Sequence, residues 1–89
     1  KEVEALLLEL DGIQEAAVVG IPDDEWGERV VAILIGAGDA GEIKSFSAKH
    51  LAPYKRPRQI HFVDDFPRNA MGKIQKAKLR QKLADGDIS

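Results

Sequence analysis

The apolar residues of the chain alternate between helical and strand-like spacing. Near the start they recur at i, i+3, i+4 and i+7, which predicts an amphipathic helix that Asp11-Gly12 ends. These residues are Val3, Leu6, Leu7 and Leu10. A second stripe with helical spacing follows a glycine-rich turn at residues 36–41, and Pro53 ends that helix. Its members are Ile43, Phe46, His50 and Leu51.

Three apolar segments predict strands. Residues 16–21 form the first strand, which stops at a turn cluster at residues 22–24. Residues 29–35 are rich in β-branched side chains and form the second, and residues 59–63 form the third. Because the link between the first two strands is short, we expect them to pair antiparallel.

A basic helix is predicted to begin near Lys73 or Ile74 and to run to about Leu83. Residues 52–58 are expected to be loop or extended, because prolines disfavour helix before them. The order α-β-β-α-β-α predicts an α+β fold, with helices packed on a small, mostly antiparallel three-stranded sheet. A length of 89 residues indicates one domain, residues 1–89.

Composition narrows the function classes. The chain has no cysteine, which excludes disulfides and thiolate metal sites and favours a reducing compartment, for which we expect the cytoplasm. The longest apolar run, residues 30–35, is too short to cross a membrane. The chain starts at Lys1 without a methionine or a signal-peptide pattern, so we expect it to be a piece of a longer protein.

Charge is segregated along the chain. Residues 1–54 hold 4 basic and 11 acidic side chains, whereas residues 55–82 hold 9 basic and 2 acidic ones, within a net charge of −2. A basic segment of this kind faces an anion, a protein or nucleic acid, or else it is a solvated helix surface.

The sequence PRNAMGK at residues 67–73 places a lysine after a stiff loop. It departs from a phosphate-binding P-loop, because Pro67 stands in place of the first glycine and Ile74 in place of Ser or Thr. Lys73 lies at the expected start of a helix, where unpaired N–H groups and the helix dipole favour an anion. Gly72 permits an unusual backbone angle. These residues alone leave two interpretations open: a lysine held toward a phosphate, or a solvated one.

Other stretches carry weaker signals. Tyr54 begins the run YKRPR, where an aromatic ring and guanidinium groups could contact a base and phosphates. Trp26 is the only tryptophan. It follows an acidic run at residues 23–25, which we interpret as a solvated turn or a cation site. The two histidines show no ligand spacing and no serine lies in a nucleophile context, so we expect no metal site and no hydrolase triad.

Taken together, four segments resemble the small C-terminal domain of the adenylate-forming enzymes. This superfamily includes acyl-CoA synthetases, luciferases and the adenylation domains of nonribosomal peptide synthetases. The segments are EVE, AAVVGIPDDEWGERVVA, LAPYKRPR and FPRNAMGKIQKAKLR, in this order and spacing from residue 2 to about residue 83. The chain looks most like an acyl-CoA synthetase, and its PRNAMGK motif is similar to short-chain and malonyl-type ligases.

The resemblance implies an AMP-forming carboxylate–CoA ligase of the kind found in fatty acid metabolism. ATP, with Mg²⁺, and the acid would be bound mainly by a large N-terminal domain that is absent here. The small domain would first serve formation of an acyl-adenylate and then rotate to help CoA form the thioester. The hinge would lie just upstream of residue 2, and the fragment alone would be inactive.

The resemblance also implies residue roles. Lys73 would be the catalytic lysine of adenylation, on a loop shaped by Pro67 and Gly72. It would also be open to a lysine acyltransferase and a deacylase, since acylation removes its charge. The residues implied to contact CoA are Trp26 and Gly27 at its entrance, Tyr54 on its adenine, and Lys55 or Arg56 on its phosphates.

Two alternatives remain open at this point. The acceptor thiol could belong to the phosphopantetheine of a carrier protein instead of CoA. More remotely, residues 55–82 could form a small nucleic-acid-binding module, whose binding would depend steeply on salt. We expect no nucleic acid as a partner, because the acidic half and the order of the motifs favour the enzyme.

Overall fold

The structure is a computed structural model that describes residues 1–25 and 27–88. It confirms the α+β fold and the order of the predicted elements. These are α1 (Glu2–Leu7), β1 (Ile13–Asp23), β2 (Gly27–Gly36), α2 (Ala40–His50), the 3₁₀ turn η1 (Pro53–Lys55), β3 (Gln59–Phe62) and α3 (Lys76–Ala84).

The three strands form one sheet in the order β1-β2-β3. β1 and β2 pair antiparallel, as the short link predicts, with Val18 opposite Ala32. β3 pairs parallel to β2, with Val31 opposite Gln59, because the chain crosses through α2 and η1 before it returns to the sheet. The mostly antiparallel sheet is therefore confirmed.

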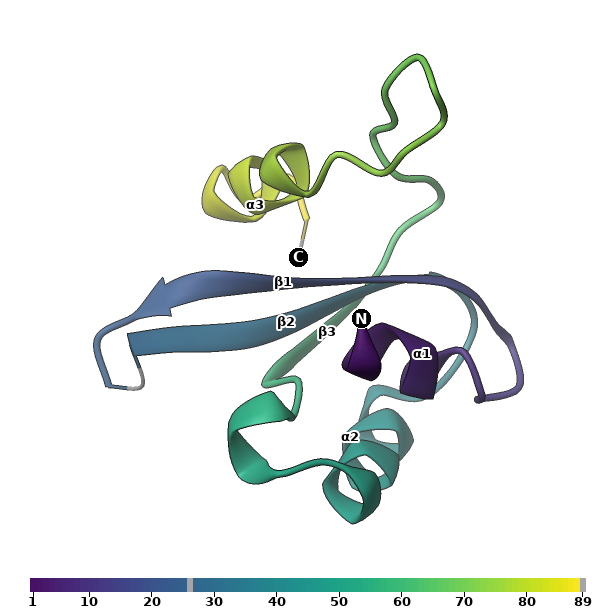
Figure 1. Cartoon of the computed structure of the whole chain (residues 1–89), viewed down its shortest axis with the longest axis vertical. Coiled ribbons are helices and arrows are strands. Elements are labelled where there is room, and N and C mark those ends of the chain that lie inside the picture. The colour runs from purple at the N-terminus through teal and green to yellow at the C-terminus, as the bar shows by residue number, and fades with distance from the viewer. Residues whose placement is uncertain (26, 89) are drawn as a thin grey trace.

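The central strand β2 supplies both faces of the core. Val31 and Ile33 pack on the side of α3, whereas Ala32 and Leu34 pack on the side of α1 and α2. All four side chains are fully buried, and their alternation follows the two-residue period of a strand. Figure 1 shows the result, with α3 above the sheet and the other two helices below it.

Several boundaries differ from the predictions. β1 continues through the expected turn at Pro22, since a proline is tolerated on an edge strand, where its nitrogen needs no ladder partner. α1 ends at Leu7, before Asp11-Gly12, although Leu10 beyond it still packs on the same core. The segment expected to be loop or extended contains the single turn η1.

The buried face of α2 also differs from the predicted stripe. Ile43, Ser47 and Leu51 are buried, at i, i+4 and i+8. His50 is exposed, and its ring lies 4.7 Å from the ring of the half-buried Phe46 on the outer side. A serine can occupy the core because its hydroxyl donates to the carbonyl of Ile43 at 2.9 Å.

The start of α3 corrects the prediction for Lys73. The helix begins at Lys76, not at Lys73 or Ile74. Residues 67–75 instead form an irregular hairpin, in which Arg68 and Ile74 make an isolated antiparallel bridge. Lys73 therefore does not lie at a helix N-terminus, and the prediction that such a terminus favours an anion there is wrong.

Candidate functional site

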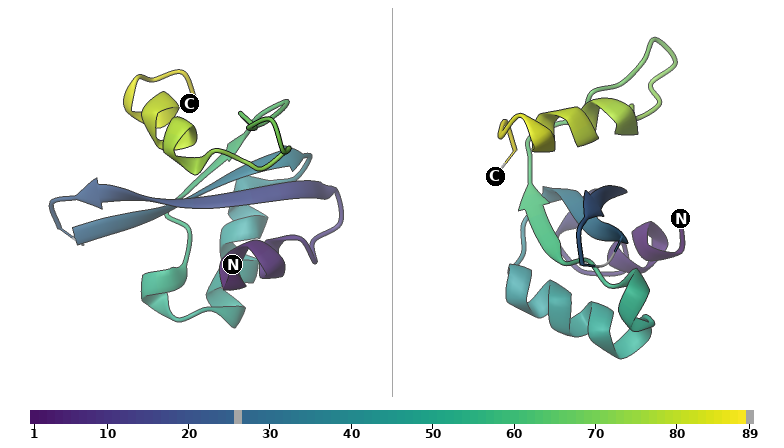
Figure 2. Two further views of the ribbon diagram at one scale, coloured as in Figure 1. Left: turned by 45° about the horizontal axis from the view of Figure 1, so that its top comes forward. Right: turned by 90° about the vertical axis from the view of Figure 1, so that its left-hand side faces the viewer.

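Lys73 lies on the hairpin of residues 67–75, which projects from the α3 side of the sheet (Figure 2). The backbone N–H of Gln75 donates to the carbonyl of Pro67 at 2.8 Å and closes the base of the hairpin. At its far end, the N–H of Gly72 donates to the carbonyl of Asn69 at 2.9 Å. Gly72 has a φ of 82°, as hairpins with a three-residue loop require at this position.

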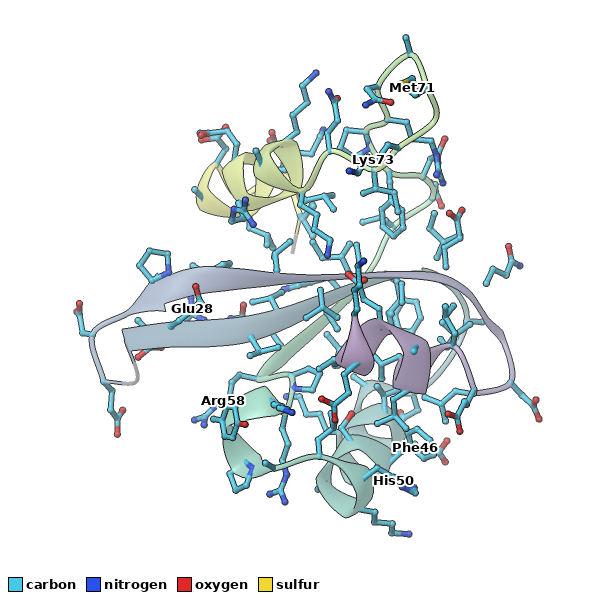
Figure 3. All side chains as sticks on the ribbon, viewed as in Figure 1. Glu28, Phe46, His50, Arg58, Met71 and Lys73 are labelled. Carbon is cyan, nitrogen blue, oxygen red and sulfur yellow. The ribbon has the colours of Figure 1, made fainter. Side chains whose placement is uncertain are left out.

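The Lys73 ammonium is exposed, and no residue in the described part of the chain pairs with it. The backbone N–H of Lys73 donates to the side-chain oxygen of Asn69 at 3.0 Å. Met71, at the tip of the same hairpin, is 92% exposed (Figure 3). The backbone at Lys73 is thus held in place while its charge remains available to an anion from outside this domain.

Arg68 anchors the hairpin to the sheet. One guanidinium nitrogen donates to both carboxylate oxygens of Glu15, on β1, at 2.7 Å, and it also lies 3.5 Å from Asp65. The hydrogen bond to Glu15 is the main cause that raises the pKa of Arg68 above its usual range. The guanidinium also lies 5.8 Å from the ring centroid of Phe66, which is buried against Leu79 of α3. The base of the hairpin is therefore fixed by the core.

A second group of candidate residues surrounds η1. Tyr54 is 72% exposed, and a small pocket of about 50 Å³ lies beside it. The Nε of Arg56 donates to the carbonyl of Leu51 at 2.9 Å, which directs this side chain. The pocket is lined by Glu28, Pro53, Tyr54, Arg56 and Arg58. A ring beside two guanidinium groups is a chemistry suited to a nucleotide with phosphates.

The predicted CoA residues are not all in this pocket. Lys55 is paired with Glu2 of α1 at 2.6 Å, and this hydrogen bond raises the pKa of Lys55. Gly27 begins β2 with a φ of 76°, in open space. Trp26 lies outside the described residues. Arg58 was not among the predicted site residues, although the run YKRPR contained the signal for it.

The two groups lie on opposite sides of the sheet. Lys73 and the hairpin lie on the α3 side, whereas Arg58 and η1 lie on the side of α2 (Figures 2 and 3). The structure therefore does not bring the predicted adenylation lysine and the predicted CoA residues together. One partner surface could meet both groups only if the domain turned between the two contacts.

Metal-ligating side chains and helix lengths can be checked in the part of the chain that the structure describes. No cluster of three or more His, Cys, Asp or Glu side chains within it could hold a metal ion. None of its helices is long and apolar enough to cross a membrane.

Comparison with known proteins identifies the family. The pattern of the AMP-binding enzyme C-terminal domain matches residues 2–73, so the chain belongs to this family. This match includes the residues around η1 and the hairpin as far as Lys73. The chain is therefore a domain of the adenylate-forming class of enzymes.

Individual relatives are CoA ligases by name. The chain is 43% identical to 3-[(3aS,4S,7aS)-7a-methyl-1,5-dioxo-octahydro-1H-inden-4-yl]propanoyl:CoA ligase of Mycobacterium tuberculosis, covering 90% of this chain and 17% of that protein. It is 43% identical to 2-succinylbenzoate–CoA ligase of Bacillus pumilus, covering 91% and 17%. The crystal structure of apo MatB from Rhodopseudomonas palustris superimposes with a TM-score of 0.90 at 36% identity, over 94% of this chain and 18% of that one. The chain thus spans less than a fifth of the length of these proteins.

Proposed function

We propose that this chain is the mobile C-terminal domain of an ATP-dependent, AMP-forming carboxylate–CoA ligase. The observation that carries the proposal is the exposed ammonium of Lys73, which pairs with none of the residues that the structure describes, on an anchored hairpin within the segment that matches the family. The names of the relatives support a CoA ligase over other adenylate-forming activities. The absence of cysteine supports a reducing compartment such as the cytoplasm.

In the first half-reaction, a carboxylate attacks the α-phosphate of ATP to give an acyl-adenylate and pyrophosphate. The N-terminal domain of the full-length protein would bind the acid and ATP with its Mg²⁺. Lys73 would reach into that site and donate to the oxygens on which negative charge develops. Removing a donor of this kind from a transition state typically costs about 10²–10³ in rate.

In the second half-reaction, the thiol of CoA displaces AMP and forms the thioester. The exposed ring of Tyr54 would stack on the adenine, and Arg56, with Arg58 beside it, would meet the phosphates. Because this group and Lys73 lie on opposite sides of the sheet, the domain would have to rotate between the half-reactions. Lys55 would contribute only if its ion pair with Glu2 opened.

The proposal is tested with Lys73→Ala in the full-length enzyme. We expect pyrophosphate release to fall by about 10²–10³, with near-normal thioester formation from supplied acyl-adenylate. Lys78→Ala is a matched control, since Lys78 is an exposed lysine on the neighbouring helix α3. It should leave both half-reactions unchanged.

Two results would contradict the proposal. Unchanged adenylation in Lys73→Ala would remove the lysine from the mechanism. An equal loss in both half-reactions would indicate a general folding defect in place of a role in one step.

A further inference from the structure

The side-chain amide of Asn69 makes the two shortest side-chain hydrogen bonds in the turn of the hairpin, where Nη1 of Arg68 also donates to the carbonyl of Gly72 at 3.5 Å. Its Oδ1 accepts hydrogen bonds from the backbone N–H of Met71 at 2.9 Å and of Lys73 at 3.0 Å. The backbone of Asn69 makes two more, accepting from the N–H of Gly72 and donating to the carbonyl of Lys73, both at 2.9 Å. Asn69 therefore holds both backbone polar groups of the candidate catalytic lysine.

We propose that Asn69 is a positioning residue for Lys73, whose side-chain oxygen fixes the direction in which the lysine leaves the hairpin. The proposal rests on the proposed function, in which the Lys73 ammonium acts in the adenylation transition state. Asn69 acts through the backbone of the loop and needs no contact with substrate. It is suited to this role because asparagine at the first position of a turn commonly accepts from backbone groups further along.

The role is separable from the stability of the domain. Asn69, Met71 and Lys73 are all exposed, so water can replace the lost acceptor when the amide is removed. The base of the hairpin keeps its own contacts, from Gln75 to Pro67 and through Arg68. Loss of the amide would therefore loosen the tip and leave the rest of the domain folded.

A loosened tip would misplace the lysine amine. Misplacement of a catalytic group by about 1 Å can cost on the order of 100-fold in rate, and we expect a loss of about 10-fold to 100-fold in adenylation for Asn69→Ala. The loss should appear in kcat, with KM for ATP unchanged, since the amine is engaged mainly in the transition state.

The test uses three variants of the full-length enzyme. Asn69→Ala removes the acceptor, and Asn69→Ser restores a shorter one that can still accept from the backbone two residues on. Gln81→Ala is the matched control, because it removes an exposed side-chain amide bond, to Asp85 at 2.9 Å, away from the hairpin. We expect Asn69→Ala to slow adenylation without slowing thioester formation. Asn69→Ser should recover part of the adenylation rate, and Gln81→Ala should match the wild type.

Amide hydrogen exchange of the same full-length variants gives a readout that is independent of activity. The N–H groups of Met71 and Lys73 should exchange faster in Asn69→Ala than in wild type or in Gln81→Ala. Faster exchange with unchanged adenylation would overturn the positioning role, as would a loss that extends equally to thioester formation.

The two hypotheses fail differently. If Lys73→Ala leaves adenylation intact, the proposed function itself is wrong. If Lys73→Ala abolishes adenylation while Asn69→Ala does not affect it, only the positioning role is wrong.

Discussion

Glu4 joins three elements of the fold, and its removal should destabilise the domain measurably. From α1 its Oε2 accepts from the backbone N–H of Val18 at 2.7 Å, on the open edge of β1, and lies 2.6 Å from the ammonium of Lys76, the first residue of α3. The Glu4 side chain is only 18% exposed. A hydrogen bond to a charged group contributes about 1.5–3 kcal/mol, whereas a pair with a lysine that is 40% exposed adds only about 0.2–1 kcal/mol.

Two substitutions separate these contributions. Glu4→Ala removes both and should lower the free energy of unfolding by about 2–4 kcal/mol. Glu4→Gln keeps an uncharged acceptor for Val18 and should lose less, about 1–2 kcal/mol. For a domain of this size, each kcal/mol lowers Tm by about 4–8 °C. Thermal and urea unfolding at neutral pH measure both losses, and equal losses for the two variants would refute the assignment to the Val18 bond.

The pH dependence provides a second check. Partial burial favours the neutral form of Glu4, but the contacts with Lys76 and Val18 outweigh it and hold the pKa of Glu4 below its usual 4.5. A lowered pKa in the folded state means that the stabilisation is present above pH 4.5 and is lost as the pH falls through the folded-state pKa. The difference between wild type and Glu4→Ala should therefore shrink in that acidic range. A constant difference would contradict the argument.

Three further predictions concern the candidate sites. Gly72→Ala should destabilise the hairpin by about 1–2 kcal/mol, because a φ of 82° is unfavourable for alanine. The space around a new Cβ is open, so no steric clash adds to this cost, and an unchanged Tm would contradict the prediction. Tyr54→Ala in the full-length enzyme should weaken CoA binding by about 1–3 kcal/mol, measured as KM for CoA, whereas Tyr54→Phe should retain the stacking. Acylation of Lys73 by a lysine acyltransferase should block adenylation, spare thioester formation and be reversed by a deacylase, because it removes the charge. Unimpaired adenylation by the acylated enzyme would disprove that regulation.

The fold was largely predictable because its strands and helices have clear apolar periods. The irregular segment before α3 was not predicted. The start of α3 was misplaced because the basic residues from Lys73 onward suit a helix, whereas the N–H of Lys73 bonds to Asn69. The sequence did contain a signal for a hairpin, namely an asparagine three residues before Gly72.

The candidate sites were predictable only in part, because pairing across the chain cannot be read from local patterns. Lys55 or Arg56 was predicted to meet the CoA phosphates, and the structure pairs Lys55 with Glu2, 53 residues away, which no local pattern indicated. Arg68 was assigned no role, although it anchors the hairpin to Glu15 over the same separation. A charged residue in a motif can thus serve the fold, the site or both, and only the three-dimensional contacts separate these roles.

These ion pairs give the segregation of charge along the chain a structural role. The acidic first half supplies Glu2, Glu4 and Glu15, and each pairs with a cation of the basic segment at residues 55–82. The segment is thereby drawn onto both sides of the sheet, which argues against one continuous basic face for nucleic acid. Lys73 has no such ion pair among the described residues, because the hairpin projects away from β1, whose Glu15 pairs with Arg68. The same attraction that assembles the domain therefore leaves the Lys73 ammonium exposed, as the proposed function requires.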